Sequence, residues 1–133
     1  MNSQFSKSLE EAKEHLIIVE GKKDKISLQQ LGFQHIFIIN ESGKSIYEKI
    51  EEIEFLVESE KRKLCILTDF DKKGKQLYLL LKSELSAKKI KLDNSFRQVL
   101  LKLNITHIEG LSNFLEKQNE KWTRKNRKNN GSA

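Results

Sequence analysis

Residues 63–74 read Lys-Leu-Cys-Ile-Leu-Thr-Asp-Phe-Asp-Lys-Lys-Gly and hold the most informative pattern in the chain. The apolar residues 64–67 form a short run that ends in turn-forming residues, which is typical of a strand covered on both faces. Asp69 and Asp71 follow where that strand runs out. In an extended chain, side chains two residues apart point the same way with Cβ atoms about 7 Å apart, so both carboxylates can approach one hydrated cation. Helical apolar spacing follows Gly74, and the stretch therefore predicts a strand, an acidic loop and a helix.

The acids after this strand also have an ordinary structural explanation. Asp69 or Asp71 could cap the following helix by accepting hydrogen bonds from its free N–H groups. Two acids at this spacing after a buried strand favour a metal site over a cap alone. A second acidic strand end elsewhere in the chain would favour it further.

Residues 16–24, Leu-Ile-Ile-Val-Glu-Gly-Lys-Lys-Asp, supply that second acidic strand end. An apolar run again ends in a carboxylate, Glu20, followed by glycine and a charged helix start. In a doubly wound parallel sheet the carboxyl ends of the strands lie on one edge, where ligands bind. We therefore expect Glu20, Asp69 and Asp71 to converge from two strands.

The motifs VEGKKD at residues 19–24 and LTDFDKKGK at residues 67–75 resemble those of the Toprim domain. Topoisomerases, bacterial-type primases, recombination proteins and some nucleases share this domain. The whole chain resembles the small stand-alone Toprim proteins of archaea and bacteria, a group close to the ribonuclease that matures bacterial ribosomal RNA. The resemblance implies a Toprim (Rossmann-like) fold with Asp69 and Asp71 as Mg²⁺ ligands. It also implies that Glu20 is a general acid or base and a further metal contact.

The order of predicted elements gives the same architecture without the resemblance. Apolar runs predict strands at residues 16–19, 36–39 and 64–67, a further short strand is predicted at residues 105–108, and helical patterns lie between them. We expect one α/β domain with a mostly parallel sheet of about four strands flanked by helices. A short helix on which Phe5, Leu9 and Ala12 share a face precedes the first strand, and it could pack on the sheet or on a partner. The predicted domain covers residues 1–120, and residues 121–133 form a basic tail.

Positive charge is concentrated at the end of the chain. The net charge is +6, and residues 121–130 alone carry five positive charges and no negative one. Such a segment suits contact with phosphates through counterion release, although a tail that only aids solubility explains it equally well. Lysines at the two predicted helix starts could meet a polyanion lying over the metal, or could simply offset the neighbouring carboxylates. The predicted nucleic-acid contacts are Lys22, Lys23, Lys72, Lys73, Lys75, Arg124, Lys125, Arg127 and Lys128.

Several further residues are weaker candidates. Glu109 ends the fourth predicted strand and is followed by glycine, as Glu20 is, so it could join the acidic edge. Gly21 and Gly74 are additional site candidates because each follows the acids of its motif. His107 could point to the same side as Glu109, but a structural histidine is the favoured interpretation. The single cysteine, Cys65, is expected to be a buried small hydrophobe.

The composition limits the classes of function. The longest apolar run spans residues 77–81, far short of the roughly 20 residues that a membrane span needs, and no signal peptide opens the chain. We therefore expect a cytoplasmic protein without membrane contact. Tyr47 and Tyr78 lie on predicted covering helices of a single-domain chain, so topoisomerase-like strand passage is not expected.

The predicted function is Mg²⁺-dependent phosphodiester chemistry on nucleic acid, with Mn²⁺ as a substitute metal. A nuclease acting on RNA is slightly favoured by the resemblance to the ribosomal-RNA ribonuclease, and RNA processing and DNA repair both stay open. The alternative is a non-catalytic nucleic-acid-binding or adaptor module. A homodimer or a protein partner is compatible with either.

Overall fold

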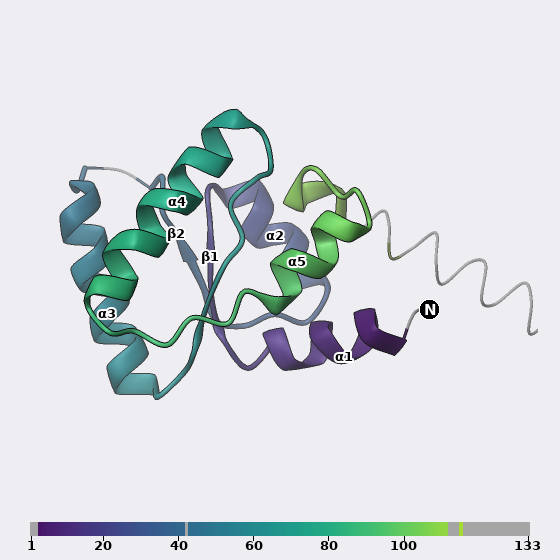
Figure 1. The fold of residues 1–133 in the computed structure, drawn as a ribbon, viewed down its shortest axis with the longest axis horizontal. Helices are drawn as coiled ribbons and strands as arrows, with labels where there is room; N and C mark the ends of the chain where they lie inside the picture. Colours follow the sequence, from purple (N-terminus) through teal and green to yellow (C-terminus); the bar gives the residue numbers. More distant parts are fainter. Residues whose placement is uncertain (1–2, 42, 112–114, 116–133) are drawn as a thin grey trace, which may run out of the picture.

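The computed structural model describes residues 3–41, 43–111 and 115. In that part of the chain three parallel strands form one sheet in the order β2-β1-β3: β1 (Leu16–Val19), β2 (Ile36–Ile38) and β3 (Leu64–Ile66). The central strand, β1, pairs through Ile17 with Ile36 on one side and Cys65 on the other. The predicted α/β class and the parallel sheet between helices are confirmed (Figure 1).

The fourth strand predicted at residues 105–108 was wrong. The structure has no strand there, and Ile108–Gly110 forms a short 3₁₀ helix, η1. The backbone groups of this segment bond elsewhere: the Ile105 N–H to the Leu100 carbonyl, and the Thr106 carbonyl to the Phe70 N–H. Hydrogen bonds to a helix end and a loop therefore replace a sheet ladder. The outer edge of β3 carries instead a single parallel bridge between Leu64 and Leu92.

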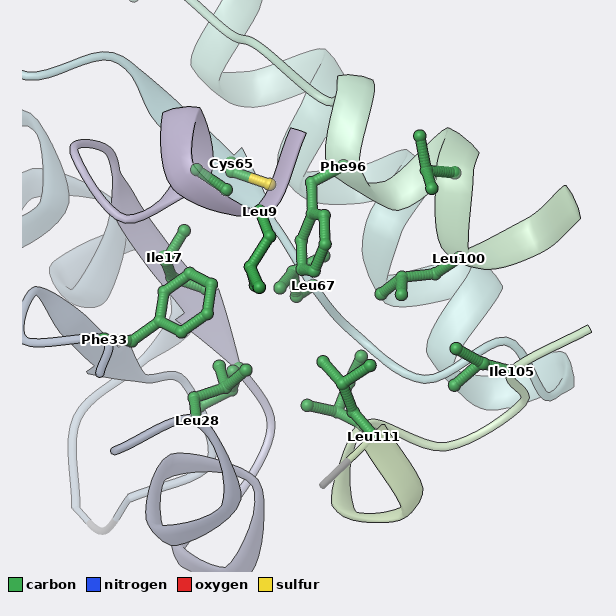
Figure 2. Packing of buried hydrophobic residues seen from close by; sticks show 14 of the residues in the cluster. Leu9, Ile17, Leu28, Phe33, Cys65, Leu67, Phe96, Leu100, Ile105 and Leu111 are labelled. Carbon is green, nitrogen blue, oxygen red and sulfur yellow. The ribbon is translucent and has the colours of Figure 1, made fainter. Parts of the chain in front are cut away.

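Helices cover both faces of the sheet (Figure 1). On one face lie α1 (Ser3–Ala12), α2 (Lys22–Gln30) and α5 (Ser95–Lys102), and on the other lie α3 (Ile46–Glu60) and α4 (Lys72–Ala87). Successive strand residues point to opposite faces, so each strand contributes to two separate apolar clusters. Figure 2 shows the first cluster, in which Ile17, Cys65 and Leu67 meet Phe33 and Phe96. The continuous apolar runs in the sequence thus reflect burial on both faces.

The leading helix packs on the protein's own body. Phe5, Leu9 and Ala12 are buried, as their helical spacing predicts. The Phe5 ring lies 6.0 Å from the Phe96 ring, which places α1 against α5.

Cys65 is fully buried, and burial raises its pKa to about 12. It therefore behaves as the small hydrophobe that the sequence predicts.

Two sequence predictions fall wholly or partly outside the described residues. The basic tail at residues 121–133 lies there, as do most of the residues between 111 and the predicted end of the domain at residue 120. None of the helices in the described ranges is long and apolar enough to cross a membrane.

Candidate metal centre

Asp69 lies just past the end of β3, where the strands β1 and β3 finish on the same edge of the sheet. Its backbone N–H donates to the Glu20 carboxylate at 2.7 Å, and its own Oδ1 accepts from the Ile108 N–H at 3.1 Å. Its second oxygen, Oδ2, is 3.7 Å from Nδ1 of His107. The Asp69 side chain is only 22% exposed, so these contacts define its direction. Segments that are 49 and 39 residues away along the chain therefore position one carboxylate.

Asp71 begins α4 as its N-cap. Its Oδ1 accepts from the Gly74 N–H at 2.8 Å, so the capping role considered from the sequence is present. An added Cβ at Gly74 would lie 2.1 Å from the Asp69 carbonyl oxygen, a distance that no real Cβ adopts. The Thr68 hydroxyl also donates to the Gly74 carbonyl at 2.8 Å. Gly74 thus allows the first turn of α4 to approach the acidic loop closely enough to fix both aspartates.

Asp69, Asp71 and His107 each offer a ligand atom, and these three atoms lie within 4.8 Å of one another. The Asp71 and His107 side chains are exposed, so water or a phosphate oxygen could reach the group. Two carboxylates and an imidazole form a donor set that divalent cations accept, and the carboxylates suit Mg²⁺ or Mn²⁺. The residues present therefore fit a divalent metal ion, and we call these three residues the metal trio.

Glu20 belongs to the same edge but not to this trio. Its carboxylate bonds the Asp69 backbone, whereas the group of ligand atoms found among the described residues takes its third member from His107. Glu20 and Asp69 do lie side by side, but the contact joins the Glu20 carboxylate to the backbone N–H of Asp69 and not to its carboxylate. Glu20 is therefore placed beside the aspartates as a neighbour of the trio.

A further carboxylate, that of Asp24, increases the negative charge near this edge. Asp24 is 7% exposed, and its carboxylate accepts from the Gly21 N–H at 3.0 Å at the start of α2. Burial raises the pKa of Asp24 above its ordinary value, and the nearby charges of Asp69, Glu20 and Glu109 raise it further. The end of the sheet thus concentrates more carboxylates than the metal trio alone, which favours a cation there.

A buried arginine, Arg97, forms hydrogen bonds with the backbone at the carboxyl end of β3. Arg97 of α5 is 2% exposed, and its guanidinium donates to the Thr68 carbonyl at 2.6 Å and the Ile66 carbonyl at 3.3 Å. The guanidinium carbon lies 4.1 Å from the centre of the Tyr78 ring and 4.3 Å from that of Phe70. Burial lowers the pKa of Arg97, and the nearby acidic groups oppose this shift. Arg97 therefore fixes the carbonyls directly before Asp69 and places a positive charge behind the acids.

The remaining predicted site residues are found at the same edge or outside the described residues. The predicted lysine contacts in the first turns of α2 and α4 are exposed: Lys22, Lys23, Lys72, Lys73 and Lys75. Glu109 lies exposed in η1, and its carbonyl accepts from the Ser27 hydroxyl at 3.3 Å. An added Cβ at Gly21 would meet Asp24 only at 3.9 Å, so a side chain fits there. Arg124, Lys125, Arg127 and Lys128 lie outside the described residues.

One member of the metal trio, His107, and one residue that supports it, Arg97, were not assigned to the site from the sequence. His107 was considered because it could point to the same side as Glu109, but a structural histidine was the favoured interpretation. Arg97 was passed over as a charged position on a helix. A signal for it exists, because Arg97 directly follows the buried Phe96 and precedes the buried Leu100 by three residues, which places it on the apolar side of α5.

Both the sequence and the fold are similar to those of known proteins. The Toprim domain family model matches residues 15–100. A UPF0292 protein from Methanocaldococcus jannaschii is 35% identical over 81% of this chain and 84% of its own length. A UPF0292 protein from Pyrococcus abyssi is 36% identical over 73% of this chain and 71% of its own length. A solved structure, a putative protein from Aquifex aeolicus, superimposes with a TM-score of 0.68 and 32% identity, covering 82% of this chain and 96% of that one.

Proposed function

Because this chain belongs to the Toprim domain family, we propose that it performs Mg²⁺-dependent phosphodiester chemistry on nucleic acid. Family membership indicates a metal-dependent function related to nucleic acid. The finer proposal is a nuclease that prefers RNA to DNA. The grouping of the Asp69, Asp71 and His107 ligand atoms within 4.8 Å is the observation that carries it.

Asp69 and Asp71 would hold the metal ion, with His107 beside them. A bound Mg²⁺ supplies positive charge that polarises a phosphodiester and stabilises the attacking or leaving oxygen. The protein's own contribution is to hold the ligands. Asp69 is fixed by Ile108 and by the backbone bond to Glu20, and Asp71 by its cap on α4.

Glu20 is the proposed general acid or base. Its carboxylate lies within 2.7 Å of the Asp69 N–H, so it is held beside the proposed metal ligands without being one of the trio. A carboxylate in that place could take a proton from an attacking water or return one to the leaving oxygen. Exposed lysines at the starts of α2 and α4 would meet the flanking phosphates.

The test uses two isosteric variants, Asp69→Asn and Glu20→Gln. Labelled RNA and DNA are incubated with Mg²⁺, Mn²⁺ or a chelator, and cleavage and binding are measured separately. Each variant should lower turnover by about 100-fold or more while still binding nucleic acid, because each keeps an oxygen for its backbone hydrogen bond. Glu51→Gln, on the exposed surface of α3, is the matched control. Full activity in both test variants would contradict the proposal.

A non-catalytic nucleic-acid-binding or adaptor module is the second candidate. One observation favours it: Glu20 and Asp69 each accept a backbone hydrogen bond, so these acids have a structural role without any metal. On this interpretation, removing residues 121–133 abolishes binding together with its salt dependence, while the two acidic substitutions change binding little. Metal-dependent cleavage that is lost in Asp69→Asn would exclude this candidate.

A further inference from the structure

A concave basic surface lies at the opposite edge of the sheet, where β3 begins. It encloses about 430 Å³, and we call it the basic pocket. Six of its lining residues are cationic and one is acidic. The lining consists of Val57, Glu58, Lys61, Arg62, Lys63, Lys88, Lys89, Ile90 and Lys91.

The charge of the basic pocket stands out against the rest of the protein. Residues 1–120 carry a net charge of only +1. The lining of the pocket carries +5, so the remainder of this range is at −4. The pocket is therefore a local concentration of positive charge in a nearly neutral body, and its field would attract a polyanion.

Backbone hydrogen bonds fix the two segments that form the pocket. The Leu64 N–H donates to the Lys91 carbonyl at 3.0 Å, and the Asp93 N–H donates to the Leu64 carbonyl at 2.8 Å. The connection from α3 to β3 therefore lies beside the segment that leaves α4. Lysines that are distant in sequence, such as Lys63 and Lys89, share one surface as a result.

The preference for lysine at helix C-termini explains only some of the lysines in the basic pocket. Lysine at a helix C-terminus is favoured by the helix dipole, and Lys61 and Lys88 are the C-caps of α3 and α4. Lys61 and Lys89, however, have φ values of 55° and 61°, in the left-handed region where glycine is the favoured residue. The chain carries lysine at both positions despite the backbone cost.

Most of the charge in the pocket is not neutralised within the protein. Lys88 pairs with Glu54 at 3.6 Å, and Arg62 is 4.0 Å from Glu60. The other four lysines form no ion pair with any residue that the structure describes: Lys61, Lys63, Lys89 and Lys91. These four charges are available to a ligand.

The helix α4 connects the basic pocket to the metal trio. It starts at Asp71 and runs back along the sheet to the edge where β3 begins (Figure 1). Its 16 residues span about 24 Å, or about seven base-pair steps of a duplex. Lys75 and Lys82 are exposed and seven residues apart, so they lie on nearly the same face of the helix. The neighbouring helix α3 carries six glutamates and one lysine, which would repel a polyanion from its side.

We propose that the nucleic acid positioned at the metal trio continues along α4, and that the basic pocket binds its phosphates at the far end of that helix. This inference rests on the proposed function, because it takes the ligand to be the same nucleic acid. Lys75 and Lys82 lie between the metal trio and the basic pocket, so a ligand with charges along its whole length, such as a nucleic-acid backbone, can meet all three regions. The pocket then acts as an anchor that holds the substrate in register with the metal trio.

The test removes two positive charges from the basic pocket with substitutions that do not strain the backbone. In Lys61→Gly/Lys89→Gly, glycine suits the left-handed conformation of both positions, so the variant should fold at least as well as the wild type. The control, Lys7→Ala/Lys49→Ala, removes the same charge from α1 and α3, where alanine favours the helix. Binding of RNA and DNA duplexes of about 20 base pairs, longer than the span of α4, is measured in chelator over a range of salt concentrations.

The pocket variant should bind about tenfold more weakly, and the slope of log affinity against log salt should fall by about 2, one for each lost phosphate contact. The control should change affinity less than about twofold. Wild-type affinity in the pocket variant, or an equal loss in both variants, would overturn the inference. If the wild type binds neither nucleic acid in chelator and cleaves neither with Mg²⁺ or Mn²⁺, the proposed function itself fails. If it binds and cleaves through Asp69 while the pocket variant binds normally, only the anchor fails.

Discussion

The two ends of β3 are built in different ways. Where the strand ends, Asp69 and Arg97 are buried or partly buried and are held by hydrogen bonds to backbone groups. Where it begins, Lys61 and Lys63 are exposed and fixed only through their backbone. The arrangement of the candidate metal ligands at the carboxyl end therefore depends on the packed interior, whereas charge at the starting end can be changed with little effect on the fold. Substitutions should have large, coupled effects at the first end and small, additive effects at the second.

Gly74→Ala should have the largest effect. The new Cβ would meet the Asp69 carbonyl oxygen at 2.1 Å, and because that contact is backbone, the acidic loop must move. We expect a loss of about 3 kcal/mol or more in the free energy of unfolding, measured by denaturant titration. Gly110→Ala is the control, since a Cβ added there would have no atom within 4 Å among the described residues, and it should change stability by less than about 0.5 kcal/mol. Equal stability of the two variants would contradict the close approach of α4 to the acidic loop.

Arg97→Met should cause the second largest loss in the free energy of unfolding. Methionine keeps much of the packing volume between Phe70 and Tyr78 but leaves the Thr68 carbonyl without its donor, at a cost of about 2–3 kcal/mol. Arg62→Met at the start of β3 is the matched comparison. Arg62 is partly exposed and donates to the Glu14 carbonyl, so its loss should cost less than about 1 kcal/mol. Arg97→Lys should recover only part of the loss, because lysine lacks the planar fork. A smaller loss in the free energy of unfolding for Arg97→Met than for Arg62→Met would contradict the difference between the two ends of β3.

The pH dependence of stability should have opposite signs at the two ends. At the carboxyl end, burial raises the pKa of Asp24 above its ordinary value of 3.8. Its contribution to stability is therefore full below about pH 3.8 and is lost as the pH rises through the folded pKa. Asp24→Asn keeps an acceptor for the Gly21 N–H and removes the charge. Its stability relative to the wild type, measured in chelator, should rise between acidic and neutral pH.

Asp93, at the starting end, supplies the comparison. A hydrogen bond from the Ser95 hydroxyl lowers its pKa, and a bond from His15 lowers it further. Its contribution is therefore present above pH 3.8 and is lost as the pH falls through the folded pKa. Asp93→Asn should be less stable than the wild type at neutral pH, and the difference should shrink in acid. The same sign of pH dependence in both variants would contradict these assignments.

The smallest effect is expected at the start of β3. Lys61→Gly alone places glycine at a left-handed φ of 55° and should raise the free energy of unfolding by about 0.5 kcal/mol, because the conformation no longer costs energy. Thermal unfolding at moderate salt measures this change. A loss of stability would show that the Lys61 side chain contributes to folding as well as to charge.

Local pattern was enough to predict much of the fold. The runs at residues 16–19 and 64–67 are apolar throughout because both faces of the sheet are covered, and this led to their assignment as strands buried on both faces. Residues 105–108 combine two isoleucines with a threonine and a histidine and were also predicted as a strand, but they form none, because their backbone groups bond to α5, the Phe70 loop and Asp69. Nothing in those four residues reveals which partners the rest of the chain will offer.

The sequence by itself determined the parallel α/β order, the acids at the carboxyl ends of two strands and the lysines beside them, because all of these follow from short-range spacing and from the geometry of a parallel sheet. Only the tertiary structure decided that His107 completes the metal trio, that Arg97 is buried behind Asp69, and that lysines from two helix ends share a pocket. These side chains come from segments that are distant in sequence. They meet through long-range packing and hydrogen bonds, which no local pattern encodes.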